Sequence, residues 1–136
     1  MLIMGIDYGD KRTGVAISDP TGTISGRAFT VTMSERAALV RRLADIAREE
    51  KIEVIVVGKP LNMDGSAGPR AEACAALADE LAAAAGLRVD MIDERLTTVS
   101  AYSYLRAGGK NARKGKKEVD AVAASIILQQ YLDGMK

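Results

Sequence analysis

The chain has 136 residues, of which 48% are hydrophobic and 27% are charged, so we expect a single domain over residues 1–136 with its own core. The net charge is only +1, which argues against disorder. Histidine is absent and Cys74 is the only cysteine, which excludes imidazole catalysis, an intrachain disulfide and a thiolate zinc site. Carboxylate, lysine, arginine and hydroxyl chemistry remains, and a bound metal is expected to be a hard cation such as Mg²⁺ or Mn²⁺.

The sequence shows no sign of membrane association or export. No apolar run is long enough to span a bilayer, and residues 1–6 lack the basic flank and the length of a signal peptide. We therefore expect a cytoplasmic protein with no membrane partner. Cys74 lies in an alanine-rich segment, which is typical of a small core residue rather than a nucleophile.

Apolar segments predict five strands, at residues 2–7, 13–18, 28–33, 54–57 and 89–92. The first is a nearly continuous apolar run, as expected for a strand buried on both faces. The short connection to the second strand indicates an antiparallel hairpin, whereas helical segments separate the later strands and indicate parallel pairing. The pattern predicts an α/β fold, with a mixed five-stranded sheet and helices on both faces.

Four segments predict helices between and after these strands. The first has Ser34 as its candidate N-cap. The second begins at Pro69, which suits a first helical turn, and stops at Gly86, which suits a C-terminal cap. The third is expected from Thr97 or Thr98 to about residue 107, and the last over residues 119–132.

Residues 106–117 form a concentrated basic segment, which we expect to be a flexible loop because it contains three glycines. The segment holds six of the 19 basic residues and leaves 13 against 18 acidic residues elsewhere. Its basic residues are Arg106, Lys110, Arg113, Lys114, Lys116 and Lys117. Nucleic-acid phosphate is the obvious partner, although charge alone is equally compatible with a solvated loop that keeps the protein soluble.

Three carboxylates are expected to meet at one edge of the sheet. Asp7 ends the first strand and Glu94 follows the last, and the carboxyl ends of parallel strands share an edge. The basic segment is long enough to return Asp120 to the same place. Because three such groups repel one another, their convergence favours a divalent cation. Taken singly, each acid also suits a structural role: Asp7 in a turn, Glu94 paired with Arg95, and Asp120 at a helix N-terminus.

Four ordered segments resemble the motifs of the YqgF-type (RuvX) nuclease family. They are GIDYGDKRTGVAISD at 5–19, VGKPLNMDGS at 57–66, DERLTT at 93–98 and VDAVAA at 119–124. The resemblance implies an RNase H-like fold, with Asp7, Glu94 and Asp120 as a catalytic triad that holds one or two Mg²⁺ or Mn²⁺ ions. Ala123 stands where related resolvases carry a further acid, so a fourth ligand is not evident.

The resemblance also implies metal-assisted hydrolysis of phosphodiester bonds, by endonuclease or exonuclease action, at the ends of pre-16S ribosomal RNA. Structured RNA is then the expected partner. Cleavage of branched DNA as a Holliday junction resolvase is the alternative, and it requires two active sites and thus a dimer. We expect a monomer or a weak homodimer. The candidate nucleic-acid-binding residues are Lys11, Arg12, Arg95, Lys110, Arg113, Lys114, Lys116 and Lys117.

Two other classes fit parts of the pattern. Actin-like and sugar kinases also begin with a strand, an Asp-x-Gly turn and a hairpin, but they need two such lobes around ATP and this chain supplies one. A nucleic-acid-binding factor without catalytic activity is the other, and the presence of Asp7, Glu94 and Asp120 counts against it.

Overall fold

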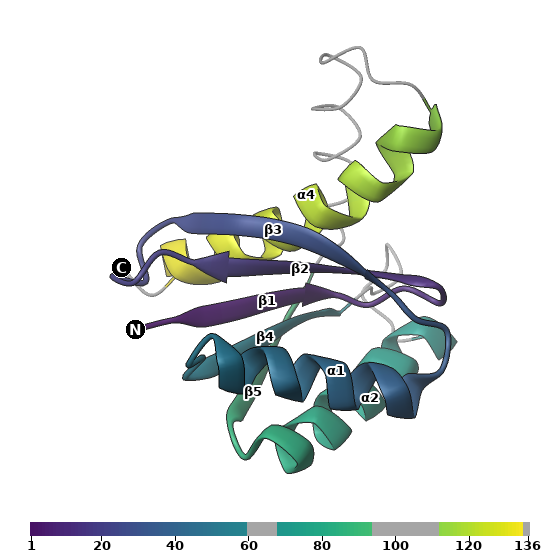
Figure 1. The fold of residues 1–136 in the computed structure, drawn as a ribbon, viewed down its shortest axis with the longest axis horizontal. Coiled ribbons are helices and arrows are strands. Elements are labelled where there is room, and N and C mark those ends of the chain that lie inside the picture. The colour runs from purple at the N-terminus through teal and green to yellow at the C-terminus, as the bar shows by residue number, and fades with distance from the viewer. Residues whose placement is uncertain (60–67, 94–111, 135–136) are drawn as a thin grey trace.

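The computed structural model describes residues 1–59, 68–93 and 112–134, and it contains a five-stranded mixed sheet in the order β3-β2-β1-β4-β5 (Figure 1). The strands are β1 (Ile3–Asp7), β2 (Arg12–Ser18), β3 (Ser25–Thr32), β4 (Val54–Lys59) and β5 (Arg88–Asp93). The pairs β1–β2 and β2–β3 are antiparallel, whereas β1–β4 and β4–β5 are parallel. The predicted mixed sheet with an antiparallel start and parallel later strands is therefore confirmed.

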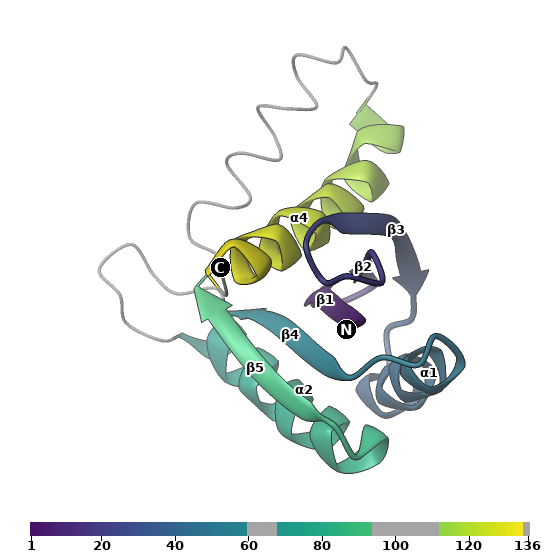
Figure 2. The ribbon, with the colours of Figure 1, turned by 90° about the vertical axis from the view of Figure 1, so that its left-hand side faces the viewer.

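Helices cover both faces of the sheet, as predicted. The helices α1 (Arg36–Glu49) and α2 (Pro69–Ala85) lie on one face, and α4 (Ala112–Gly134) crosses the other (Figure 2). The helix predicted from Thr97 or Thr98 lies outside the described residues. No helix of the described ranges has the length and apolarity needed to cross a bilayer.

The core has two layers because successive strand residues point to opposite faces. In β1, Met4 and Ile6 are fully buried in the cluster formed with α1 and α2. Ile3 is buried instead against α4, together with Val56 of β4 and Leu128 of α4. The central strand is thus covered on both sides, which explains its nearly continuous apolar sequence.

Two expected boundaries on the N-terminal half differ in the structure. β3 begins at Ser25, three residues before the predicted start, because the Ser25 N–H donates to Oε1 of Gln129 at 2.8 Å and the residue pairs with Ser18. Tertiary contacts therefore extend the strand into residues of low strand propensity. The N-cap of α1 is Glu35 rather than Ser34, and no side-chain hydrogen bond caps the helix.

The helix α2 follows the prediction at both ends. Pro69 occupies its first turn, and Gly86 caps it with a left-handed backbone at φ 68°. A glycine adopts this conformation without the steric cost that a β-carbon adds.

The prediction of a flexible basic loop is wrong for residues 112–117. These residues are helical, because α4 begins at Ala112 and not at residue 119. Arginine and lysine are good helix formers, so a helix anchored by its packed C-terminal half can extend through them despite Gly115. The N-terminal part of α4 projects beyond the sheet (Figure 1).

Candidate functional site

The three parallel strands end at one edge of the sheet, as the sequence predicted. Ile6 pairs with Val57, and Lys59 pairs with Asp93, so the ends of β1, β4 and β5 lie in register. Asp7 is the last residue of β1 and is half-buried. Glu94 follows Asp93 directly in the sequence, but it lies outside the described residues. The described part of this edge therefore contains one residue of the predicted triad.

Asp7 belongs to the face of the sheet that α4 covers. Ile3 packs in the α4 cluster, and Gly5 and Asp7 follow it at the two-residue spacing of one strand face. The cross-strand partner of Asp7 is Gly14. Paired residues of antiparallel strands share a face, so the residue next to Asp7 across β2 on the α4 side is one without a side chain.

The position of α4 is fixed by close contact with β1. An ideal β-carbon at Gly5 would lie 2.8 Å from Cβ of Leu128 and 3.2 Å from the carbonyl oxygen of Ala124. The helix therefore approaches the strand as closely as a glycine allows. Ala124 and Leu128 are one turn apart, so they mark the helix face that lies on β1.

The direction of α4 places its earlier residues near the end of β1. Gln129 bonds to Ser25 at 2.8 Å, and Ser18, which pairs with Ser25, accepts a hydrogen bond from the N–H of Ile3 at 2.9 Å. The C-terminal half of α4 thus lies over the beginning of β1. Asp120 lies one turn before Ala124 in α4, displaced along the helix toward the end of β1, where Asp7 stands.

The turn between β1 and β2 is held by a close backbone approach and by hydrogen bonds. An ideal β-carbon at Gly9 would lie 1.9 Å from the carbonyl oxygen of Arg12, so only glycine fits here. The Gly9 N–H donates to Oγ1 of Thr13 at 3.4 Å, and the Met33 N–H donates to the carbonyl oxygen of Lys11 at 3.0 Å. The fixed turn presents two cations next to the strand that carries Asp7.

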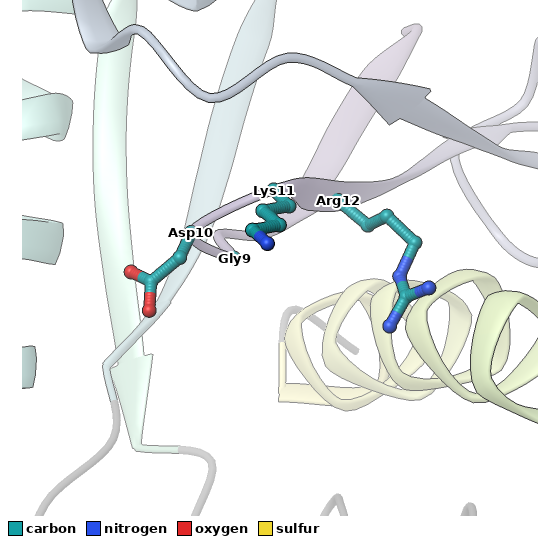
Figure 3. A pocket seen from close by; sticks show the side chains of 4 residues that line it. All are labelled: Gly9, Asp10, Lys11 and Arg12. Carbon is teal, nitrogen blue, oxygen red and sulfur yellow. The ribbon is translucent and has the colours of Figure 1, made fainter.

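An open depression of about 320 Å³ lies at this turn (Figure 3). The described residues that line it are Gly9, Asp10, Lys11 and Arg12. The Arg12 side chain points toward α4, and Asp10 points in a different direction (Figure 3). Lys11 is exposed and Arg12 is half-buried. Two of the predicted nucleic-acid-binding side chains are thus at the same edge as Asp7.

The other predicted nucleic-acid-binding residues divide into two groups. Arg113, Lys114, Lys116 and Lys117 belong to the first turns of α4, in the part that projects beyond the sheet. Arg95 and Lys110 lie outside the described residues. The first group therefore gathers on a helix and not in the expected loop.

Sequence reasoning missed Arg70, in the first turn of α2. Its Nη1 donates to Oδ1 of Asp10 at 3.0 Å, and its Nη2 donates to the carbonyl oxygen of Tyr8. The guanidinium lies over the Tyr8 ring, 5.3 Å from its centroid. One feature of the sequence points to these contacts. A cation in the first turn of a helix is unfavourable to the helix dipole, so a partner that compensates for it is expected.

The sheet order, the covered faces and the acidic strand end define an α/β domain of the RNase H-like class. Residues 1–134 match the family model RuvX, described as Holliday junction resolvase. A Moorella thermoacetica protein named "Putative pre-16S rRNA nuclease" is 45% identical over 133 residues, which cover 98% of this chain and 95% of the relative. A Streptococcus sanguinis protein of the same name is 44% identical over 136 residues, with 98% of each chain covered. The chain belongs to the RuvX family.

Solved structures show the same fold. A RuvC from T. thermophilus in complex with a Holliday junction substrate superposes with a TM-score of 0.65 at 15% identity, covering 99% of this chain and 95% of that one. The fowlpox virus Holliday junction resolvase superposes with a TM-score of 0.65 at 13% identity and full coverage of both chains. The predicted RNase H-like fold is confirmed.

Proposed function

We propose that this protein is a divalent-metal-dependent nuclease that processes the ends of pre-16S ribosomal RNA. The observation that carries the proposal is the placement of Asp7 and Asp120: one ends the central strand, and the other lies one turn before the close contact of α4 with that strand. Relatives named as pre-16S rRNA nucleases at 40–45% identity over nearly the whole chain support RNA as substrate. With such a substrate, the protein would act in the cytoplasm.

The chemistry of the donor set fits a hard cation. Asp7 and Asp120 would supply carboxylate oxygens, which are the ligands that Mg²⁺ and Mn²⁺ prefer. Glu94, the third residue of the predicted triad, lies outside the described residues. Asp7, Glu94 and Asp120 would hold one or two Mg²⁺ or Mn²⁺ ions.

A divalent metal held by these residues would supply Lewis acidity, for the activation of a water molecule and for stabilisation of the charge on the leaving oxygen. The chain's own cations bind the nucleic-acid backbone. Lys11 and Arg12 lie next to Asp7 on the fixed β1–β2 turn, where they can neutralise phosphates on either side of the scissile bond. The basic first turns of α4 extend this contact beyond the sheet.

Cleavage of branched DNA is the second candidate, because the family model carries the description of a Holliday junction resolvase. That reaction requires two incisions placed symmetrically on a junction, and hence a dimer. A single incision site suffices for trimming an RNA end, so the RNA reaction is compatible with a monomer.

A side-by-side cleavage assay tests the proposal. A precursor fragment containing the 16S 5′ end and a four-way DNA junction are incubated with the pure protein, with Mg²⁺, with Mn²⁺ and with chelator. We expect metal-dependent cleavage of the RNA in preference to the junction. Preferential and paired incision of the junction would support the resolvase, and no cleavage of either substrate would contradict the nuclease proposal.

A further inference from the structure

We infer that Arg70 is a positioning residue of the nuclease site, which holds the β1–β2 turn so that Asp7 and the cations beside it keep their arrangement. The inference rests on the proposed function. Tyr8 follows Asp7 directly, and Arg70 contacts both the carbonyl oxygen and the ring of Tyr8. The same guanidinium reaches Asp10 at 3.0 Å. One side chain of α2 therefore binds the turn at two of its residues.

The contacts of Arg70 with the turn come from the face of the sheet opposite α4. The helix α2 packs on the sheet together with α1, whereas α4 lies on the other side (Figure 2). The end of β1 is thus held from one side by the contact of Gly5 with α4 and from the other by Arg70. Both helices fix the strand that carries Asp7, and a metal site depends on such support for the orientation of its ligands.

A direct role in binding phosphate is less compatible with these contacts. Nη1 and Nη2 of Arg70 each donate to a group of the turn, and the face of the guanidinium is stacked on Tyr8. To bind a phosphate in the same way, the side chain would have to release Asp10 or the Tyr8 carbonyl. Lys11, which is exposed and lines the depression, is better placed for that contact.

The chain offers a matched control in Arg27. Its guanidinium lies 5.6 Å from the centroid of the Phe29 ring and pairs with Glu50, so it combines a ring contact and a carboxylate as Arg70 does. Arg27 lies on β3 next to Ala28, whose partner Ala16 pairs with Gly5, so Arg27 is two strands away from β1 and lies before the strand end that carries Asp7. Its removal tests the effect of deleting such an interaction away from the site.

The experiment compares the full-length variants Arg70→Gln, Arg70→Lys, Asp10→Asn and Arg27→Gln. Backbone amide exchange of the metal-free protein reports the turn, calorimetric titration with Mn²⁺ reports the metal site, and cleavage of the precursor RNA against Mg²⁺ concentration reports function. We expect Arg70→Gln to speed exchange of the Gly9 amide and to weaken Mn²⁺ binding about tenfold, with a similar rise in the Mg²⁺ concentration for half-maximal cleavage. Arg70→Lys and Asp10→Asn should show smaller shifts in the same direction, and Arg27→Gln none.

Three results would overturn the inference. Unchanged Gly9 exchange and Mn²⁺ affinity in Arg70→Gln would make the contact incidental, as would equal shifts in Arg27→Gln. Unchanged Mn²⁺ affinity with a reduced salt dependence of RNA binding would make Arg70 a phosphate ligand instead. If Arg70→Gln does not fold, the Arg70→Lys variant decides by the same measurements. Failure of the wild-type protein to cleave RNA contradicts the proposed function, while the exchange of Gly9 still tests the grip of Arg70 on the turn.

Discussion

Gly5 lies directly beneath Leu128, so close that an ideal β-carbon on the glycine would stand 2.8 Å from Cβ of the leucine. Real β-carbons essentially never approach to this distance, so any side chain at position 5 would push the helix away from the strand. Because Asp120 is two turns before Leu128 on the same helix, this one contact links the packing of the core to the position of a proposed metal ligand.

The variant Gly5→Ala should therefore destabilise the protein, by about 1–3 kcal/mol, because the added methyl group overpacks the strand–helix contact. Chemical denaturation followed by circular dichroism measures the effect. The rate of RNA cleavage should fall by more than the loss of folded protein accounts for, because α4 must shift relative to Asp7. Gly134→Ala is the matched control: apart from its chain neighbours and its own helix backbone, an ideal β-carbon there meets no described atom within 4 Å, so stability should be unchanged or slightly raised.

The variant Asp7→Asn should abolish metal-dependent cleavage, with a loss of about 100-fold or more, because the amide lacks the charge that holds a divalent ion. Asparagine preserves the size of the half-buried side chain, so the unfolding midpoint should remain close to that of the wild type. RNA binding without metal should also persist, since Lys11 and Arg12 are intact. Single-turnover cleavage with Mg²⁺ checks the prediction, and full activity of the pure variant would disprove the metal mechanism.

Most of the fold could be predicted because its signals are local. The apolar run of β1, the Pro69 start and the Gly86 stop of α2 each act within a few residues, and the structure confirms them. The start of β3 at Ser25 could not be predicted in this way. It depends on a hydrogen bond to Gln129, a residue 104 positions away in the sequence, and on pairing with the end of β2.

The helical state of residues 112–117 was missed for a related reason. Six basic residues with three glycines indicate a loop, because like charges repel and glycine disfavours helix. The packed residues Ala124 and Leu128 anchor a helix that then extends through the basic stretch. For the site, the sequence predicted the shared strand edge, but the contacts of Arg70 with Tyr8 and Asp10 required the fold to bring α2 beside the turn.

The helical basic stretch leads to a prediction about nucleic-acid binding. The double variant Lys116→Ala and Lys117→Ala should lower the slope of log affinity against log salt by roughly 0.7–0.9 for each phosphate that the protein no longer neutralises. Alanine favours helix, so the backbone of α4 should be retained. Fluorescence anisotropy with a labelled precursor RNA at several salt concentrations measures the slope.

A control for that measurement removes the same charge from the opposite face of the sheet. Arg41 and Arg48 lie exposed on α1, and their replacement by alanine changes the net charge by the same amount. We expect this control to leave the salt slope nearly unchanged. Equal slopes for both double variants would mean that net charge, and not the basic stretch of α4, determines the binding.

The last prediction concerns the link between α4 and the edge strand β5. The Tyr131 hydroxyl donates to Oδ2 of Asp90, and this hydrogen bond, together with Arg88, lowers the pKa of the Asp90 carboxyl. Burial, and next the hydrogen bond to Asp90, raises the pKa of Tyr131. The lowered pKa of Asp90 stabilises the fold at pH values above 3.8, and this stabilisation disappears as the pH falls through the lower folded pKa. The raised pKa of Tyr131 stabilises the fold below pH 10. This contribution to stability disappears as the pH rises through the higher pKa of Tyr131 in the folded protein.

The variant Tyr131→Phe should consequently lose about 1 kcal/mol of stability at pH 7, because the hydrogen bond disappears while the ring remains packed. The difference from the wild type should shrink on the acid side, once Asp90 is protonated in both proteins, and again above the pKa of Tyr131. Urea denaturation at a series of pH values from about 2 to about 11 tests both the acid and the alkaline change. This range brackets the ordinary pKa values of the two groups. If the stability difference between Tyr131→Phe and the wild type were the same at every pH, the hydroxyl would act through the packing of the ring and not through its hydrogen bond to Asp90.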